Sequence, residues 1–309
     1  MVYESCKSVI PALMQHNLDD AALLCQWGPS PCDLPTPPLP PPLMPTDYSA
    51  QTLLIEGTDA VAFAQAQFTS DVQSLAVGQW QFSAWLDAQG RVLALFQLAR
   101  IADDSLLLLL RGGDASSMAP SLQRFVFRSK VKLSVLEPRA LATGGALETY
   151  AVHREGDAYV FGCGDHSVLV GAAVADDAWR VLQVRAGWPW LPNDALGALL
   201  PPAISLERLQ AVAFDKGCYP GQEIVARLHY RGGHKRHMHC VVLSQFVSGG
   251  TVLHRNGDNS IQLLDVANDD ATFRALAVID DGLMNSLDDA SRIDTDEGIR
   301  LHVVQSWSA

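Results

Sequence analysis

The 309-residue chain is 48% hydrophobic, which is enough apolar side chain for a large core and for two or three domains. Its 22 Lys and Arg residues against 34 Asp and Glu residues give a formal net charge of -12. This balance excludes a protein whose whole surface attracts nucleic acid or anionic membranes, so any bound anion must meet a local basic patch.

The hydropathy pattern gives no membrane span. The longest aliphatic run, residues 106–110, is far shorter than the roughly 20 apolar residues that a spanning helix needs. The first 20 residues contain three acidic side chains and lack the basic start and apolar run of a secretory signal. We therefore expect no membrane association and a cytoplasmic location in a bacterium.

Proline dominates residues 29–45, a composition that favours extended polyproline II structure and cannot build a core. We expect residues 1–45 to form a disordered extension that takes no part in function. An extension of this kind also arises when a start codon is assigned too far upstream.

Helices and strands alternate in the region that follows. Helices are predicted from about residue 59 to residue 68, after a Gly-Thr-Asp turn, and after Asp114, which is a suitable N-cap residue. Strands are predicted for four short apolar segments, residues 52–55, 131–135, 158–161 and 167–170.

The region from residue 237 to the end reads as a small all-β module, most simply a barrel. Its short apolar runs are separated by Asn, Asp and Gly turns and cover residues 241–243, 261–266, 276–279 and 301–304. The chain as a whole is therefore expected to have an α+β fold.

The six cysteines form no C-x-x-C pair, which argues against a disulfide framework and against a zinc ribbon. They are widely spaced, at Cys6, Cys25, Cys32, Cys163, Cys218 and Cys240. Each is therefore considered as a separate thiol.

The segment from residue 215 to residue 236 holds the densest set of reactive and turn-forming residues. Pro220 and Gly221 are the preferred central pair of a type II turn, which places Cys218 at the lip of a tight turn. The alternating apolar residues over 224–228 predict a strand that leaves this turn. Residues 216–236 carry five fixed positive charges against one negative charge, so the local basic patch lies here.

Cys218 has two interpretations. Nearby cations favour the thiolate and would make the sulfur reactive towards electrophiles or soft metals. An isolated cysteine is more often a small buried residue fitted under a turn. The Lys-Gly before it and the Pro-Gly after it favour the functional thiol, because a structural cysteine needs neither.

A run of histidines, at positions 229, 234, 237 and 239, precedes Cys240 and raises the question of a metal site. The spacing matches no established metal site, and only His237 and His239 would share one face of a strand. We interpret these residues as polar side chains on a loop and a strand edge, and we assign no metal ligand.

The sequence resembles the folate-binding YgfZ family. The resemblance rests on the motif Lys-Gly-Cys-Tyr-Pro-Gly-Gln-Glu over residues 216–223 and on Val-Ala-Arg at 225–227, Tyr-Arg-Gly at 230–232 and Lys-Arg at 235–236. Weaker similarity covers most of the chain after the extension, including residues 67–72, 87–91, 127–131 and 186–189.

The resemblance implies a T-protein-like fold, that of the aminomethyltransferase of glycine cleavage, with two intertwined α+β domains over residues 46–236 and a C-terminal β-barrel over residues 237–309. It implies a tetrahydrofolate derivative as cofactor and a role in assembling or repairing iron-sulfur proteins, including those that modify transfer RNA. The expected partners are iron-sulfur enzymes or cluster carriers and the folate itself, with no direct contact to nucleic acid.

The motif positions that resemble the family's site transfer to this chain one by one. Cys218 is expected to be the functional thiol, with Lys216 beside it. The positions expected to hold the cofactor are Tyr219, Gly221, Gln222, Glu223, Arg227 and Arg231.

Two departures from the T-protein pattern affect the chemistry. Ala94 and Leu95 align with a pair of aspartates in the T-protein, one of which is the catalytic carboxylate. Arg185 stands where relatives that bind folate often carry glutamate, and arginine cannot accept hydrogen bonds from a pterin. We therefore expect an accessory factor rather than a conventional enzyme, with two alternatives: a folate-dependent one-carbon transferase of the aminomethyl type, or a pure interaction module.

Overall fold

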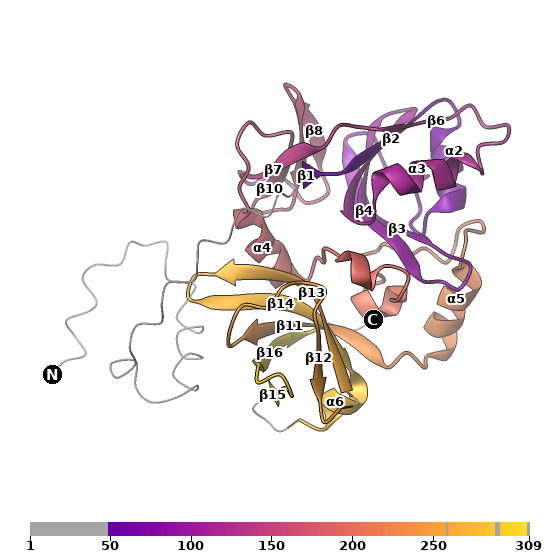
Figure 1. Cartoon of the computed structure of the whole chain (residues 1–309). Helices are drawn as coiled ribbons and strands as arrows, with labels where there is room; N and C mark the ends of the chain where they lie inside the picture. Colours follow the sequence, from indigo (N-terminus) through magenta and orange to yellow (C-terminus); the bar gives the residue numbers. More distant parts are fainter. Residues whose placement is uncertain (1–48, 258, 288–290, 308–309) are drawn as a thin grey trace. The chain divides into compact units, whose positions relative to one another are not determined.

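Antiparallel sheets form the framework of the protein (Figure 1). The computed structural model describes residues 49–257, 259–287 and 291–307. The predicted extension over residues 1–45 lies outside these described residues.

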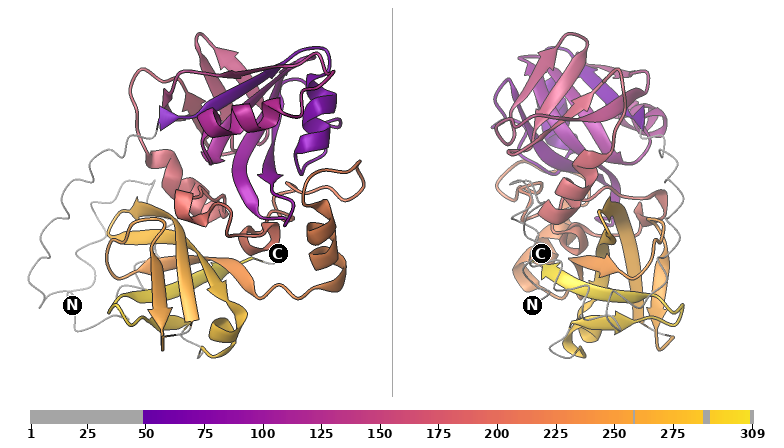
Figure 2. Two further views of the ribbon diagram at one scale, coloured as in Figure 1. Left: turned by 45° about the vertical axis from the view of Figure 1, so that its right-hand side comes forward. Right: turned by 90° about the vertical axis from the view of Figure 1, so that its left-hand side faces the viewer.

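The first sheet has the strand order β3-β4-β5-β2-β6. Its strands are β2 (Thr52–Glu56), β3 (Gln79–Leu86), β4 (Val92–Ala102), β5 (Ser105–Gly112) and β6 (Lys132–Val135). Two helices, α2 (Ala60–Gln67) and α3 (Ala115–Gln123), pack on one face of this sheet, because apolar residues of both helices share one buried cluster with residues of β2, β4 and β5 (Figure 2).

The predicted elements of this region are present, with one difference in capping. Asp114 caps α3 as expected, since its carboxylate accepts hydrogen bonds from the backbone N–H groups of Ser116 and Ser117. The Asp59 side chain does not cap α2 and instead accepts a hydrogen bond from the backbone N–H of Lys130 at 2.7 Å. Asp59 thus ties the start of α2 to the segment that leads into β6.

A second sheet has the order β1-β7-β10-β9-β8. Its strands are β1 (Ser49–Ala50), β7 (Arg139–Gly144), β8 (Val152–Glu155), β9 (Ala158–Gly162) and β10 (Ser167–Val170). The helix α4 (Ala178–Ala186) and the short 3-10 helices η2 (Asn193–Ala195) and η3 (Pro201–Ile204) follow it in the chain.

The C-terminal part is a six-stranded antiparallel sheet of order β12-β13-β14-β11-β16-β15, coiled around its own apolar core as a nearly closed barrel. Its strands are β11 (Arg236–Leu243), β12 (Val252–Arg255), β13 (Asn259–Asp269), β14 (Thr272–Asp280), β15 (Arg292–Asp294) and β16 (Arg300–Ser306), with the helix α6 (Asp281–Asn285) after β14. The predicted α+β fold with a C-terminal β-barrel is confirmed.

The strand predicted over residues 224–228 is wrong, because these residues lie in the helix α5 (Gln222–Arg231). Glu223 in the first turn and Arg231 in the last turn match the helix dipole, and Gly232 ends the helix with a positive φ. Alternating apolar residues mimic a strand here, whereas Val225 is the one α5 residue that is buried. The helix predicted after Asp114 is α3, which ends at Gln123.

A buried arginine lies where β4, β5 and α4 meet. The Arg111 side chain is fully buried and donates hydrogen bonds to the side-chain oxygens of Gln97 and Gln183 and to the backbone carbonyls of Trp188 and Pro189. Burial lowers the pKa of Arg111 to about 9. These bonds fix the loop after α4 to the first sheet.

Among the helices of the described residues, none is both long enough and apolar enough to cross a bilayer.

Candidate functional site

The Cys218 segment is held in place by the side chain two residues before it. The ammonium group of Lys216 donates hydrogen bonds to the backbone carbonyls of Phe68 at 2.7 Å and Ser70 at 2.6 Å. Both acceptors follow directly after α2, so the lysine ties the turn to the link between α2 and β3. Lys216 therefore positions the segment, and its charge is largely satisfied by backbone dipoles.

The protonation of Lys216 is perturbed by this environment. Burial lowers the pKa of Lys216 to about 8, and the carboxylate of Asp71 acts in the opposite direction. The same ammonium group lies 5.2 Å from the ring centroid of Tyr219. The ammonium group therefore loses its proton at a pH much closer to neutrality than that of an exposed lysine does.

Tyr219 and Cys218 point to different environments. The Tyr219 ring is buried in the main apolar cluster, and burial raises the pKa of its hydroxyl to about 12. Cys218 is exposed, whereas the other two described cysteines, Cys163 and Cys240, are buried. The buried tyrosine thus anchors a turn that presents the neighbouring sulfur to solvent.

The turn predicted at Pro220-Gly221 is present. The backbone N–H of Gln222 donates to the carbonyl of Tyr219 at 3.2 Å, and Gly221 has φ 78° and ψ -4°, as the third residue of a type II turn requires. A Cβ atom at Gly221 would lie 2.5 Å from the Asp87 carbonyl oxygen and 2.8 Å from the Gly90 Cα. Only glycine fits this position, so the close packing fixes where α5 begins.

The remaining predicted site residues lie on α5. Gln222 is half-buried, whereas Glu223, Arg227 and Arg231 are exposed. Within the described residues, neither arginine forms an ion pair. The helix is held against the Cys218 segment by an aromatic contact, since the rings of Phe214 and His229 stack with centroids 4.1 Å apart.

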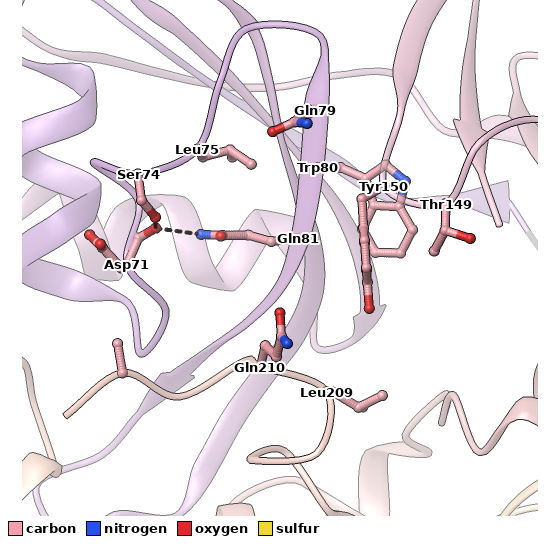
Figure 3. Close-up of a pocket in the computed structure, with 11 residues that line it drawn as sticks. Asp71, Ser74, Leu75, Gln79, Trp80, Gln81, Thr149, Tyr150, Leu209 and Gln210 are labelled. Atoms are coloured by element: carbon pink, nitrogen blue, oxygen red, sulfur yellow. Dashed lines mark hydrogen bonds between the residues drawn. The ribbon is translucent and has the colours of Figure 1, made fainter. Parts of the chain in front are cut away.

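A pocket of about 320 Å³ lies beside the segment after η3, which leads along the chain to Lys216 and Cys218 (Figure 3). It is lined by residues from the α2–β3 link, from β3, from the segment before β8 and from the segment after η3: Asp71, Ser74, Leu75, Gln79, Trp80, Gln81, Thr149, Tyr150, Leu209, Gln210 and Ala213. One backbone bond and one side-chain bond join the two sides, since the Ala213 N–H donates to the Thr69 carbonyl at 2.8 Å and the Thr69 hydroxyl donates to the Ala211 carbonyl at 2.5 Å. Lys216 adds two further hydrogen bonds between the same two segments, to the carbonyls of Phe68 and Ser70.

Two pocket residues have a backbone conformation that is rare outside glycine. Tyr150 has φ 70° and Gln210 has φ 53°, and they are two of the six non-glycine residues with positive φ in the described chain. Such conformations cost about 1–3 kcal/mol and cluster at functional sites. The Tyr150 ring stands edge-on to Trp80 with centroids 5.0 Å apart and lines the pocket (Figure 3).

The pocket offers hydrogen-bond acceptors next to aromatic surface. One carboxylate oxygen of Asp71 accepts hydrogen bonds from the Gln65 side chain at 2.9 Å and from the Gln73 backbone at 3.2 Å. The Gln81 amide donates to the Ser70 hydroxyl and to the Asp71 carbonyl. A planar heterocycle with amino and carbonyl edges suits this lining, because the carboxylate and the amides can satisfy both kinds of group.

The sequence did not single out these pocket residues. Asp71 lies in the weakly similar stretch over residues 67–72, which was the one available signal. Tyr150 and Gln210 carry no signal, because their positive φ values are imposed by long-range packing. They join the site only when the fold brings residues 71, 150 and 210 together.

The two departures from the T-protein pattern have clear structural settings. Ala94 and Leu95 are fully buried on β4 among apolar side chains, so no acid/base group stands at either position. Arg185 of α4 forms an ion pair with Asp269 of β13 at 2.6 Å, and Asp269 also accepts a hydrogen bond from Arg274 at 2.7 Å. The arginine therefore joins α4 to the C-terminal sheet.

The histidine run is spread over α5, which carries His229, the α5–β11 link and β11. His237 Nδ1 lies 2.6 Å from an Asp281 carboxylate oxygen, and His239 Nδ1 lies 2.8 Å from the Ser306 hydroxyl. Burial, with His237 nearby, lowers the pKa of His239 to about 4. Across the residues that the structure describes, no group of three or more His, Cys, Asp or Glu side chains is arranged to hold a metal ion.

Comparison with known proteins gives relatives in one family. The chain is 30% identical over 252 residues to the tRNA-modifying protein YgfZ of Photobacterium profundum, with 69% of this chain and 74% of the relative covered. It is 28% identical over 242 residues to the tRNA-modifying protein YgfZ of Aliivibrio fischeri, with coverages of 69% and 75%. No model of a known protein family matches the sequence.

Comparison with solved structures gives the fold. The glycine cleavage system aminomethyltransferase T from Bartonella henselae matches with a TM-score of 0.59 and 16% sequence identity, over 82% of both chains. At this identity the likeness establishes the fold alone. With a thiol-bearing turn that matches the family motif, a T-protein-like fold and relatives at this level of identity, the chain belongs to the YgfZ family.

Proposed function

We propose that this protein is a folate-binding accessory factor in the assembly or repair of iron-sulfur proteins, including those that modify transfer RNA, and that the Cys218 thiol is its functional group. One observation carries the proposal: an exposed cysteine sits on a rigidly anchored turn whose preceding residues line a polar, partly aromatic pocket. The relatives are named tRNA-modifying proteins, which supports the link to transfer RNA.

The pocket residues fit a tetrahydrofolate derivative. The Asp71 carboxylate can accept hydrogen bonds from the amino-pyrimidine edge of a pterin, and the amides of Gln79, Gln81 and Gln210 can pair with its remaining polar atoms. The volume of about 320 Å³ lies at the lower end of small-molecule sites, which is enough for the ring system. When bound, a folate would supply a carrier for one-carbon groups.

Each protein group then has a defined role. Tyr150 supplies aromatic surface for the ring, and Asp71 orients it. Arg227 and Arg231, exposed on α5, can meet the carboxylates of a glutamate tail. Lys216 positions the Cys218 turn through its hydrogen bonds to the backbone carbonyls of Phe68 and Ser70.

The one-carbon transferase alternative has less support. Aminomethyl transfer needs a carboxylate that manages a proton at the folate nitrogen, and the aligned positions hold the buried Ala94 and Leu95. Formation of methylenetetrahydrofolate from an aminomethyl donor by the purified protein would establish the transferase. Its absence, together with folate binding, is the result that the accessory role predicts.

Complementation tests the thiol. A bacterial strain that lacks its own family member receives the wild-type chain, Cys218→Ala, or Cys163→Ala as a matched control that removes a buried thiol. We expect wild type and Cys163→Ala to restore the activity of iron-sulfur enzymes and Cys218→Ala to fail at equal protein level. Full restoration by Cys218→Ala would exclude a role for the thiol and would favour the alternative in which the protein acts only as an interaction module.

A binding titration tests the folate separately. Calorimetric titration of the full chain with 5-formyltetrahydrofolate is repeated with Asp71→Asn and with Glu155→Gln, an exposed carboxylate outside the pocket lining and outside the Cys218 motif. Loss of an accepted pair of hydrogen bonds predicts about tenfold weaker binding for Asp71→Asn. Equal affinity for Asp71→Asn and wild type would exclude this pocket as the pterin site.

A further inference from the structure

The connection between α3 and β6 exposes two large aromatic rings. The Phe127 side chain is 85% exposed and Phe125 is 52% exposed, while Val126 between them packs against the core of the first sheet. Single exposed apolar residues are ordinary, but two phenylalanines that flank a half-buried valine packed on the core form an apolar projection. Neither ring takes part in the pocket or in the Cys218 turn.

The same segment is basic in an acidic protein. Arg124, Arg128, Lys130 and Lys132 all lie within nine residues, and no acidic residue occurs between Asp114 and Glu137. The guanidinium group of Arg128 lies 5.5 Å from the ring centroid of Phe127. Two acidic residues lie nearby, since Glu56 pairs with Lys132 across β2 and β6 and Asp59 accepts a hydrogen bond from the Lys130 backbone. The four basic side chains outnumber these two carboxylates, so the segment keeps a positive charge.

The strand that follows has an open edge. β6 is the terminal strand of its sheet and pairs with β2 alone among the described strands. The backbone N–H of Leu136 donates to the Thr52 carbonyl, so alternate residues 134 and 132 also bond to β2. The N–H and C=O groups of Leu133 and Val135 therefore face away from the sheet.

We propose that residues 124–135 form a docking surface for an extended acidic segment of a partner protein. The segment would add to the open edge of β6 through the backbone groups of Leu133 and Val135. Its acidic side chains would meet Arg128, Lys130 and Lys132, and an apolar side chain would pack on Phe127. Aromatic and arginine side chains are the residues that most often dominate binding energy in such interfaces.

The size and charge of this surface favour a protein over a nucleic acid. A nucleic acid needs several phosphate contacts along a basic groove, and the net charge of -12 opposes any polyanion beyond this small patch. A short acidic segment needs only local complementarity and a strand edge. The proposal is independent of folate binding and of the Cys218 thiol.

Fluorescence anisotropy with the full chain tests the proposal. The probe is a fluorescein-labelled peptide of about eight alternating Glu and Val residues, the length of an ordinary strand. We expect saturable binding that weakens about tenfold or more in the double variant Arg128→Glu, Lys130→Glu, because two attractive contacts become repulsive. Arg154→Glu is the matched control, since Arg154 is also exposed and lies 5.9 Å from the ring centroid of Tyr159.

A second variant addresses the strand edge. Val135→Pro removes an outward N–H without touching the bonds to β2, so we expect weaker peptide binding with an unchanged melting temperature. If this variant melts early, the charge-reversal pair decides the question, because its side chains are exposed and its folding can be checked in the same way.

Four results would overturn the proposal. These are the absence of saturable peptide binding, equal binding of a Lys-Val peptide, an equal loss in Arg154→Glu, and tighter binding of labelled oligouridylate than of the acidic peptide. Self-association that the double variant abolishes, without peptide binding, would assign the surface to a second copy of the chain instead.

Discussion

The ammonium group of Lys216 donates a hydrogen bond to the carbonyl oxygen of Ser70, 146 positions earlier in the chain, at 2.6 Å. Ser70 immediately precedes Asp71, which lines the pocket, and Lys216 lies two residues before Cys218. One side chain thus connects the pocket wall to the thiol-bearing turn. A ligand that shifts the 68–71 link will therefore shift the turn as well.

The packing around Gly221 predicts a strong effect of a single methyl group. Gly221→Ala forces a positive φ on alanine and brings Cβ to 2.5 Å from a carbonyl oxygen, which should lower the free energy of unfolding by about 2 kcal/mol or more. Gly217→Ala, in the same turn, meets nothing within 4 Å and should change it by about 0.5 kcal/mol or less. Urea unfolding of both variants checks this pair, and equal losses would contradict the structure of the turn.

The lowered pKa of Lys216 predicts a specific dependence of stability on pH. The pKa of Lys216 is about 8 in the folded protein and has the ordinary lysine value of 10.5 in the unfolded chain. Between these values the unfolded state binds more protons, so the contribution of Lys216 to the free energy of unfolding rises with pH.

The difference between wild type and Lys216→Met isolates this contribution. Measured by denaturant unfolding, the free energy of unfolding of wild type minus that of the variant should increase from pH 8 towards pH 10.5. A difference that stays constant over this range would show that the ammonium group is not desolvated.

The lowered pKa of His239 predicts a loss of stability at acidic pH. Its pKa falls from 6.5 to about 4 on folding, mainly because the ring is buried. Between these values the ring is protonated in the unfolded chain and neutral in the folded protein, so stability is lost as the pH falls from 6.5 to 4. His239→Gln should lose less over this window in thermal unfolding, and an unchanged acid sensitivity would locate its cause elsewhere.

The Arg185–Asp269 ion pair predicts that a glutamate at position 185 destabilises this protein. Arg185→Glu places a second negative charge beside the buried Asp269 and should lower the free energy of unfolding by about 3 kcal/mol. Arg154→Glu, which breaks an exposed ion pair with Asp157, should cost about 0.5 kcal/mol. A mild effect of Arg185→Glu on chemical denaturation would mean that Arg274 alone satisfies Asp269.

Local patterns predicted much of this fold, and tertiary contacts decided the rest. The Asp114 cap, the Pro220-Gly221 turn and the strands over residues 52–55 and 167–170 follow from neighbouring residues, so they could be predicted. The strand predicted over 224–228 became α5, because alternation over five residues does not distinguish a strand from one helical face.

The site divides in the same way. The exposed Cys218 and its turn are encoded in one contiguous motif and could be predicted. The pocket could not, since Asp71, Tyr150 and Gln210 come from three segments far apart in sequence. The role of Lys216 also differs from a free cation beside the thiol, because its ammonium group is spent on two backbone carbonyls.

The central claim is that the pocket and the Cys218 turn form one site, and alkylation kinetics test it most directly. The full chain is treated with iodoacetamide at increasing 5-formyltetrahydrofolate, and the modification of each cysteine-containing peptide is followed by mass spectrometry. Cys163 and Cys240 should react slowly throughout, because burial raises the pKa of both thiols, that of Cys163 to about 12. We predict that folate changes the Cys218 rate saturably, with a midpoint equal to the calorimetric dissociation constant. A Cys218 rate that is identical with and without saturating folate would contradict the account.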